Sequence, residues 1–148
     1  MKQDDIKKDA MRRYTQAMCL VEVELFNARQ SWIAEDKLSA WFQSTPTKAA
    51  FGRLMTYASL VTECYTNSDI AEKLNISRMS ANRLTKDASD AGWVKVCRHG
   101  KETTSYSASS DLVKSTTGYA EYLLDLLIKH DTLEAENLVW ALKNHGYM

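Results

Sequence analysis

The first third of the chain carries a long, regular pattern of apolar positions. Residues 4 to about 31 contain no glycine or proline, and apolar side chains recur every three or four residues, at Met11, Tyr14, Met18, Val21, Leu25, Ala28 and Trp32. This first apolar set is typical of a helix that runs alongside another helix. A second apolar set, Leu20, Val23 and Phe26, widens the surface beyond the one stripe that a surface helix needs. We therefore predict a long helix with one face for the chain's own core and one for a partner.

The pattern breaks between residues 33 and 45, where Trp41 and Phe42 are predicted to fill the core. Thr45 suits the capping position of a following helix and Pro46 suits its first turn. That helix is expected to reach about Glu63, and its predicted inward residues are Phe51, Leu54, Met55, Ala58 and Val61.

Residues 66–92 have the pattern of a helix-turn-helix. Thr66 and Asp69 approximate a capping box for a short helix, whose inward residues are Ile70, Ala71 and Leu74. Asn75 and Ile76 form the turn, and Ser77 caps a second helix over residues 78–91. Gly92 follows where a left-handed helix end is expected.

The remaining pattern predicts a hairpin and two helices. Residues 93–98 and 103–108 alternate as strands around a tip at 99–102. Ser109 or Ser110 caps a helix to about Lys129, and Asp131 opens a last helix with Glu134 at the box position. Their inward residues are Tyr119, Tyr122, Leu123, Leu126 and Leu127, then Leu133, Leu138, Ala141 and Leu142. The whole order predicts a mainly α chain with a small β-hairpin wing, that is, a winged helix-turn-helix with N- and C-terminal dimerisation helices.

The second helix of the helix-turn-helix has two contrasting sides. Ala81, Leu84 and Ala88 share one side and are predicted to face inward. The other side carries the candidate DNA-binding residues Arg78, Met79, Ser80, Asn82, Arg83 and Lys86. Arginine pairs with guanine, asparagine with adenine, serine with either bases or phosphate, and methionine with a thymine methyl, whereas lysine more often reaches phosphate. Thr66 and Ser77, at the two helix starts, complete the set. The plainer alternative is a solvent-exposed helix face.

The hairpin tip adds a second candidate contact. Arg98, His99 and Lys101 cluster there, and a cation at such a tip can enter a narrow minor groove. The alternative is a polar turn with incidental charge.

Charge supports nucleic-acid binding only weakly. The 148-residue chain has no net charge, with 45% hydrophobic and 26% charged residues. Residues 65–105 hold seven Lys/Arg against five Asp/Glu, and residues 109–148 hold three against six. The helix-turn-helix segment is thus mildly basic, while many DNA-binding domains are far more basic.

Other chemistry finds little support in the sequence. Cys19, Cys64 and Cys97 have no metal-like spacing, and a reduced protein of the cytoplasm is the simplest explanation. Cys19 lies among apolar residues and is predicted to be a buried, inert thiol. Cys97 and His99 form one pair without a second, so no metal is expected.

The N-terminus does not resemble a secretory signal, and no apolar run approaches a membrane span. The sequence contains no glycine-rich phosphate loop and no Ser/His/Asp arrangement. We therefore expect no enzymatic activity, no catalytic residues and no cofactor.

The segments 68–74, 76–78, 83–84 and 91–94 resemble the winged-helix domain of MarR-type transcriptional regulators, and the flanking helices are similar to that family's layout. The resemblance implies one MarR-like domain over 1–148, with the winged-helix part at about 46–108 and dimerisation helices at about 4–32 and 110–146. It implies a homodimeric regulator, most simply a repressor, that binds double-stranded DNA at a pseudo-palindromic operator, and it allows a small-molecule effector. The predicted dimer interface comprises Tyr14, Met18, Val21, Leu25, Leu126, Leu138 and Leu142. The tip at 98–102 lacks the Asp-Arg pair common in that family. This departure and the zero net charge keep a second hypothesis open, a dimeric winged-helix module or antirepressor that binds protein rather than DNA.

Overall fold

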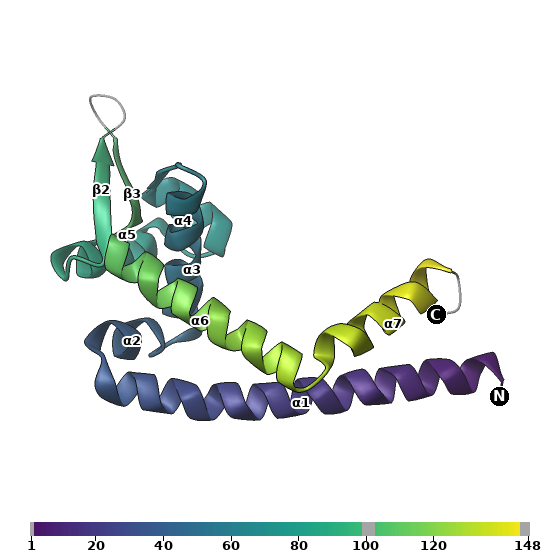
Figure 1. Cartoon of the computed structure of the whole chain (residues 1–148). Helices are drawn as coiled ribbons and strands as arrows, with labels where there is room; N and C mark the ends of the chain where they lie inside the picture. The colour runs from purple at the N-terminus through teal and green to yellow at the C-terminus, as the bar shows by residue number, and fades with distance from the viewer. Residues whose placement is uncertain (1, 99–102, 146–148) are drawn as a thin grey trace. The chain divides into compact units, whose positions relative to one another are not determined.

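The computed structural model describes residues 2–98 and 103–145, and these residues form seven helices and three short strands (Figure 1). Contacts divide the chain into two compact units. We call residues 31–119 the central unit, and residues 1–30 with 120–148 the terminal unit. In chain order the elements are α1 (Gln3–Glu35), α2 (Lys37–Phe42), α3 (Pro46–Leu60), β1 (Tyr65–Thr66), α4 (Asn67–Leu74), α5 (Arg78–Asp90), β2 (Val94–Arg98), β3 (Thr104–Ala108), α6 (Ser110–Lys129) and α7 (Thr132–Asn144).

Helix α3 supplies the centre of the central unit's core. Phe51, Met55 and Ala58 are fully buried, as the apolar spacing predicted. The predicted start is also confirmed, because the Thr45 side chain accepts a hydrogen bond from the backbone N–H of Lys48 at 3.1 Å. The predicted end is wrong: α3 stops at Leu60, and Val61 is exposed.

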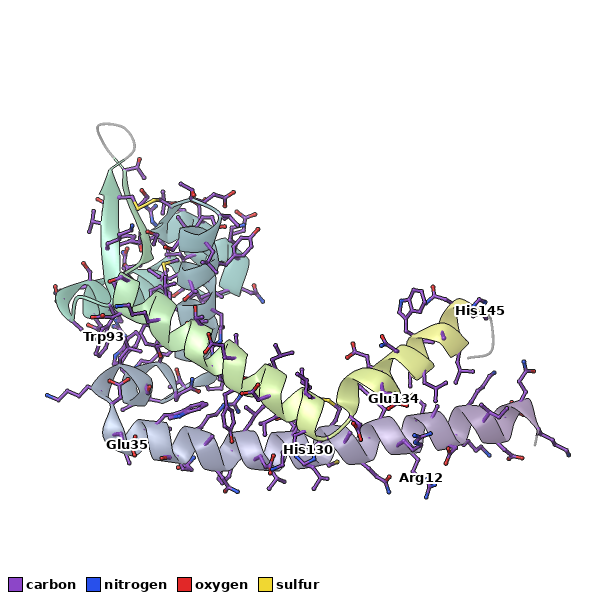
Figure 2. The ribbon with its side chains drawn as sticks, in the orientation of Figure 1. Arg12, Glu35, Trp93, His130, Glu134 and His145 are labelled. Carbon is purple, nitrogen blue, oxygen red and sulfur yellow. A yellow bond between two sulfur atoms is a disulfide. The ribbon has the colours of Figure 1, made fainter. Side chains whose placement is uncertain are left out.

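The segment before α3 contains a short helix that the sequence pattern did not predict. Helix α2 begins where the carboxylate of Asp36 accepts hydrogen bonds from the backbone N–H groups of Leu38 and Ser39. This helix places Trp41 and Phe42 against Phe51 and Trp93, with ring centroids between 5.7 and 6.3 Å apart; Trp93 is labelled in Figure 2. The prediction that Trp41 and Phe42 fill the core is confirmed.

The helix-turn-helix forms through the local hydrogen bonds that its sequence predicted. Thr66 and Asp69 make a complete capping box at the start of α4. Asn75 adopts the left-handed conformation with φ of 54° and ends that helix. Ser77 then caps α5 by accepting a hydrogen bond from the N–H of Ser80 at 3.0 Å. Gly92, with φ of 79°, follows the end of α5 as expected.

The wing is part of a three-stranded antiparallel sheet with the order β1-β3-β2. The predicted hairpin is confirmed within a residue at each end, and Val94 pairs with Ala108 at its base. Strand β1 was not predicted, because two residues are too few to show an alternating pattern. Tyr65 of β1 lies opposite Tyr106 of β3. Its hydroxyl donates a 2.7 Å hydrogen bond to Glu63, which raises the pKa of Tyr65 to about 12.

The cysteines depart from the sequence-based expectation. Cys64 and Cys97 form a disulfide with a Cα–Cα distance of 6.3 Å, so the prediction of reduced thiols is wrong for this pair (Figure 2). The two residues are 33 positions apart, and they meet because β1 and β2 flank the same strand. Cys19 is a free thiol, and it is exposed rather than buried as predicted.

The terminal unit combines the first part of α1 with the end of α6 and with α7. Val21 and Leu25 are 0% and 2% exposed, and Leu126 is 5% exposed. These three predicted interface residues therefore belong to the chain's own core. Tyr14, Met18 and Leu142 are half-buried, and Leu138 is 38% exposed.

The second apolar set of α1 is the exposed one. Leu20, Val23 and Phe26 are 54%, 58% and 59% exposed. Both predicted apolar sets are present on α1. The chain itself buries Val21 and Leu25 of the first set and half-buries the other members, whereas the second set lies at the surface.

The start of α7 also differs from the prediction. Asp131 has φ of 56°, and its side chain makes no capping hydrogen bond. Within the described part of α7, Val139 is the buried apolar residue, one position away from the predicted Leu138.

Gly52 occupies a position where α3 approaches α2 closely. A Cβ at this position would lie 2.8 Å from Cδ1 of Phe42, whose ring is buried. We therefore expect Gly52→Ala to lower the free energy of unfolding by about 1–3 kcal/mol, measured by urea denaturation, because the ring must move in a packed core.

Gly118 provides the matched control within α6. A Cβ there would have no described neighbour within 4 Å. Gly118→Ala should raise the free energy of unfolding by about 0.5–1 kcal/mol, because alanine stabilises a helix interior relative to glycine. If both variants were stabilised, the close approach at Gly52 would be disproved.

Candidate nucleic-acid interface

Helix α5 has one buried side and one exposed side. Ala81 and Ala88 are fully buried and Leu84 is 8% exposed, which confirms the predicted inward side. The opposite side is exposed at every predicted position, namely Arg78, Met79, Ser80, Asn82, Arg83 and Lys86. Met79 is 65% exposed, an unusual position for a large apolar side chain. The described part of the chain therefore leaves this side of α5 uncovered.

The cations on this side are not neutralised by neighbours. Among the described residues, no ion pair involves Arg78, Arg83 or Lys86. Helix α5 also carries the exposed carboxylates Asp87 and Asp90, which follow Lys86 in the chain. Positive charge is consequently concentrated in the first nine residues of α5.

The two predicted contacts at helix starts are engaged in capping. Ser77 accepts from the N–H of Ser80 and donates to the Ser80 hydroxyl at 2.9 Å, and both side chains are exposed. Thr66 is half-buried, and its hydroxyl accepts from the N–H of Asp69. Ser77 is thus exposed at the start of α5, whereas Thr66 is half-buried and caps α4.

A buried polar group connects α5 to α4. Thr85 is 1% exposed, and its hydroxyl donates to Oδ1 of Asn67 at 2.8 Å. The Nδ2 of Asn67 in turn donates to Oδ1 of Asn82. Sequence reasoning missed Asn67, because it is fifteen residues from Asn82 and occupies the first position after a cap, where a polar residue needs no further explanation.

Of the predicted wing contacts, the structure describes only the backbone of Arg98. Arg98 is the last residue of β2 and lies opposite Thr104 of β3. Its backbone is described and its side chain is not. His99 and Lys101 lie outside the described residues.

Other chemical sites are scarce in the described residues. They contain no cluster of three metal-ligating side chains, and Cys97, half of the predicted weak pair with His99, is in the disulfide. None of their helices has the length and apolar character needed to cross a membrane.

The terminal unit contains an ion-pair cluster and a groove beside it. Glu24 of α1 lies 2.8 Å from both Lys129 and His130, and these hydrogen bonds hold the pKa of Glu24 below its usual range. A groove of about 480 Å³ opens between α1 and the start of α7, and its walls include Arg13, His130 and Glu134. Figure 2 labels His130 and Glu134. Charges of both signs line this groove, so its electrostatics favour neither an anionic nor a cationic ligand.

Comparisons with known proteins identify the fold. No family model matches the chain, and no curated protein matches it. The DNA complex of Staphylococcus aureus MepR aligns with 82% of this chain and 96% of its own length, at 13% identity and a TM-score of 0.55. A second structure of MepR, a transcription regulator of the S. aureus multidrug efflux pump MepA, aligns over 84% and 95%, at 16% identity and a TM-score of 0.54. An apo form of Lactococcus lactis ZitR aligns over 78% and 80%, at 21% identity and a TM-score of 0.48. The chain has the winged-helix fold of the MarR-type transcription regulators.

Proposed function

We propose that this protein is a sequence-specific DNA-binding transcriptional regulator that acts as a homodimer on a pseudo-palindromic site. The observation that carries the proposal is α5, whose buried side anchors it in the central unit while its cationic side stays uncovered. A helix held in this way by a helix-turn-helix fits the major groove, where base edges are distinguishable. The MepR structure of the same fold is a DNA complex.

The predicted contact residues on and beside α5 are proposed to touch bases or phosphates. Arg83 lies in the middle of the exposed side and is proposed to read guanine, because its guanidinium can donate to both O6 and N7. Met79 is proposed to contact a thymine methyl group. Ser77, Ser80, Arg78 and Lys86 are proposed to contact phosphates or base edges, and Arg98, His99 and Lys101 of the wing are proposed to reach the adjacent minor groove.

In the proposed dimer, the exposed apolar face of α1 on one protomer packs against its partner. This face is formed by Leu20, Val23 and Phe26. Side chains of this size are rarely left in contact with water as a continuous patch unless they meet a partner. Leu124 and Ile128 of α6, 49% and 57% exposed, add apolar surface in the same unit. A two-fold dimer would present two copies of α5 to half-sites about 34 Å apart, one turn of duplex. Bound over a promoter, such a dimer would repress by excluding other proteins.

Selection of binding sites from random duplex DNA with the purified protein tests the proposal. A regulator of this kind should enrich two inverted half-sites with a fixed spacing. Binding should weaken steeply with salt, because Lys and Arg release counterions from the phosphates.

Arg83→Ala should weaken binding to the selected site by roughly 1–3 kcal/mol and flatten base preference at one position of each half-site. Arg12→Ala is the matched control, since it removes an exposed arginine on α1 that pairs with Asp9. It should leave base preference unchanged. Gel-shift titrations on the selected site and on single-base variants measure both effects.

The zero net charge favours the second candidate, a dimeric winged-helix module or antirepressor that binds protein. The salt series separates the two functions. If no sequence is enriched and no salt-dependent DNA binding is detected, the regulator proposal fails and the protein-binding module remains.

A further inference from the structure

We propose that Asn67 of α4 is a positioning residue that fixes the amide of Asn82, so that Asn82 presents its NH₂ group to hydrogen-bond acceptors on base edges. This inference rests on the proposed DNA-binding function of α5. It assigns a specificity-determining role to a residue outside the recognition helix.

The anchor of this arrangement is the hydroxyl of Thr85. Thr85 is 1% exposed, so its hydroxyl must find its partners within the protein. Its oxygen lies 2.8 Å from Oδ1 of Asn67, and 3.1 and 3.2 Å from the backbone oxygens of Ala81 and Asn82. All three neighbours are acceptors, and the shortest contact is the one to Asn67. The buried hydroxyl therefore donates toward Asn67 and holds its side-chain oxygen against α5.

The orientation of Asn67 determines the orientation of Asn82. With Oδ1 of Asn67 accepting from Thr85, Nδ2 of Asn67 is the group directed to Asn82. Two amide NH₂ groups cannot bond to each other, so Asn82 must turn its oxygen toward Asn67, as the hydrogen bond between them shows. Asn82 is exposed, and its NH₂ group is then the part of the amide left for a partner.

This orientation changes which bases suit Asn82. The sequence-based prediction was adenine, whose paired contact uses the amide oxygen and nitrogen together. With the oxygen engaged by Asn67, the free NH₂ group favours positions that present acceptors in the major groove. Guanine presents two such acceptors, N7 and O6, and thymine presents O4. Adenine presents its N7 acceptor directly beside the N6 amino donor, which would face the NH₂ group of Asn82, and cytosine presents the N4 donor. We therefore infer that Asn82 prefers guanine or thymine at the base position it contacts.

Asn67→Asp tests the inference by inverting the network. An ionised aspartate has only acceptors, so it can still accept from Thr85, but it then requires a donor from Asn82. The amide of Asn82 should turn over and expose its oxygen. Base preference at the position that depends on Asn82 should shift from guanine or thymine toward adenine or cytosine, by roughly fivefold in relative affinity.

Ser68→Asp is the matched control, because it places the same charge on the next, exposed residue of α4. Both aspartate variants should weaken binding to all sequences through repulsion of the phosphates. Only Asn67→Asp should change the preferred base. Asn82→Ala identifies the dependent position, and Asn67→Ala should reduce the preference there without reversing it.

Competition binding with the four possible base pairs at each position gives the readout, and thermal unfolding of each variant confirms that it is folded. If wild-type protein and Arg83→Ala show no difference in sequence preference, the proposed function itself fails. If Arg83→Ala flattens the preference but Asn67→Asp leaves the Asn82 position unchanged, the positioning role of Asn67 is disproved. A wild-type preference for adenine or cytosine at that position also overturns the inference.

Discussion

Reduction of the Cys64–Cys97 disulfide is expected to lower the free energy of unfolding by roughly 3–4 kcal/mol, or about 10 °C in Tm. The bond closes a loop between residues 33 positions apart, and chain-entropy arguments give an effect of this size for such a loop. It connects the segment before β1 to the outer wing strand β2, and both strands pair with β3. The Cα–Cα distance of 6.3 Å lies within the usual range for disulfides, so the backbone can hold the bond without rearrangement.

Thermal unfolding with and without dithiothreitol measures the effect. Wild-type protein should lose stability in the reductant, whereas Cys97→Ser should show the reduced stability under both conditions. Cys19→Ser is the matched control, because Cys19 is the exposed free thiol. It should respond to the reductant as the wild type does. An unchanged wild-type Tm in dithiothreitol would mean that the bond is absent or does not stabilise the fold.

The parts of the fold that were predictable are those with local chemistry. Thr66, Asn75 and Ser77 mark helix ends by hydrogen bonds to residues three or four positions away, and a sequence displays such spacings directly. The exposed and buried sides of α5 follow in the same way from helical periodicity. The winged helix-turn-helix was therefore predicted almost to the residue.

The parts that were missed depend on distant pairing. Strand β1 exists because Tyr65 lies opposite Tyr106, and the disulfide exists because the same sheet brings Cys64 and Cys97 together. Neither partner is indicated by spacing along the chain. Asn67 was missed for the same reason, since its partners Asn82 and Thr85 lie fifteen and eighteen residues away.

The two faces of α1 show a different limit of the sequence. Periodicity found both apolar sets, but it could not decide which one the chain covers itself. The first set has the spacing of paired helices, and such pairing is equally possible within one chain or between two. Burial of Val21 and Leu25 decides the question for this protein.

Phe26→Asp should therefore weaken the proposed dimer by on the order of 3 kcal/mol, roughly a hundredfold in Kd, while leaving the monomer folded. Phe26 is 59% exposed in the single chain, so the substitution removes little from the monomer's core. In a dimer built on Leu20, Val23 and Phe26, the carboxylate would be buried without a partner, and an unpaired buried charge is strongly destabilising. Sedimentation equilibrium over a concentration series gives the Kd.

Tyr57→Asp is the matched control for that experiment, because Tyr57 of α3 is an equally exposed aromatic residue, at 56%. It should sediment as the wild type does. A Phe26→Asp protein that remains fully dimeric would exclude this face of α1 from the interface.

Leu25 belongs to the dimer interface that the sequence predicted, but Leu25→Asp is expected to act in a different way. Leu25 is 2% exposed, so the charge would enter the chain's own core. Loss of the side chain's packing alone costs about 2–5 kcal/mol, and the buried carboxylate adds to it. Circular dichroism should thus show loss of folded monomer for Leu25→Asp and an intact spectrum for Phe26→Asp. A Leu25→Asp protein that is folded but monomeric would instead place the first apolar set in the interface, and it would reverse the assignment of the two faces.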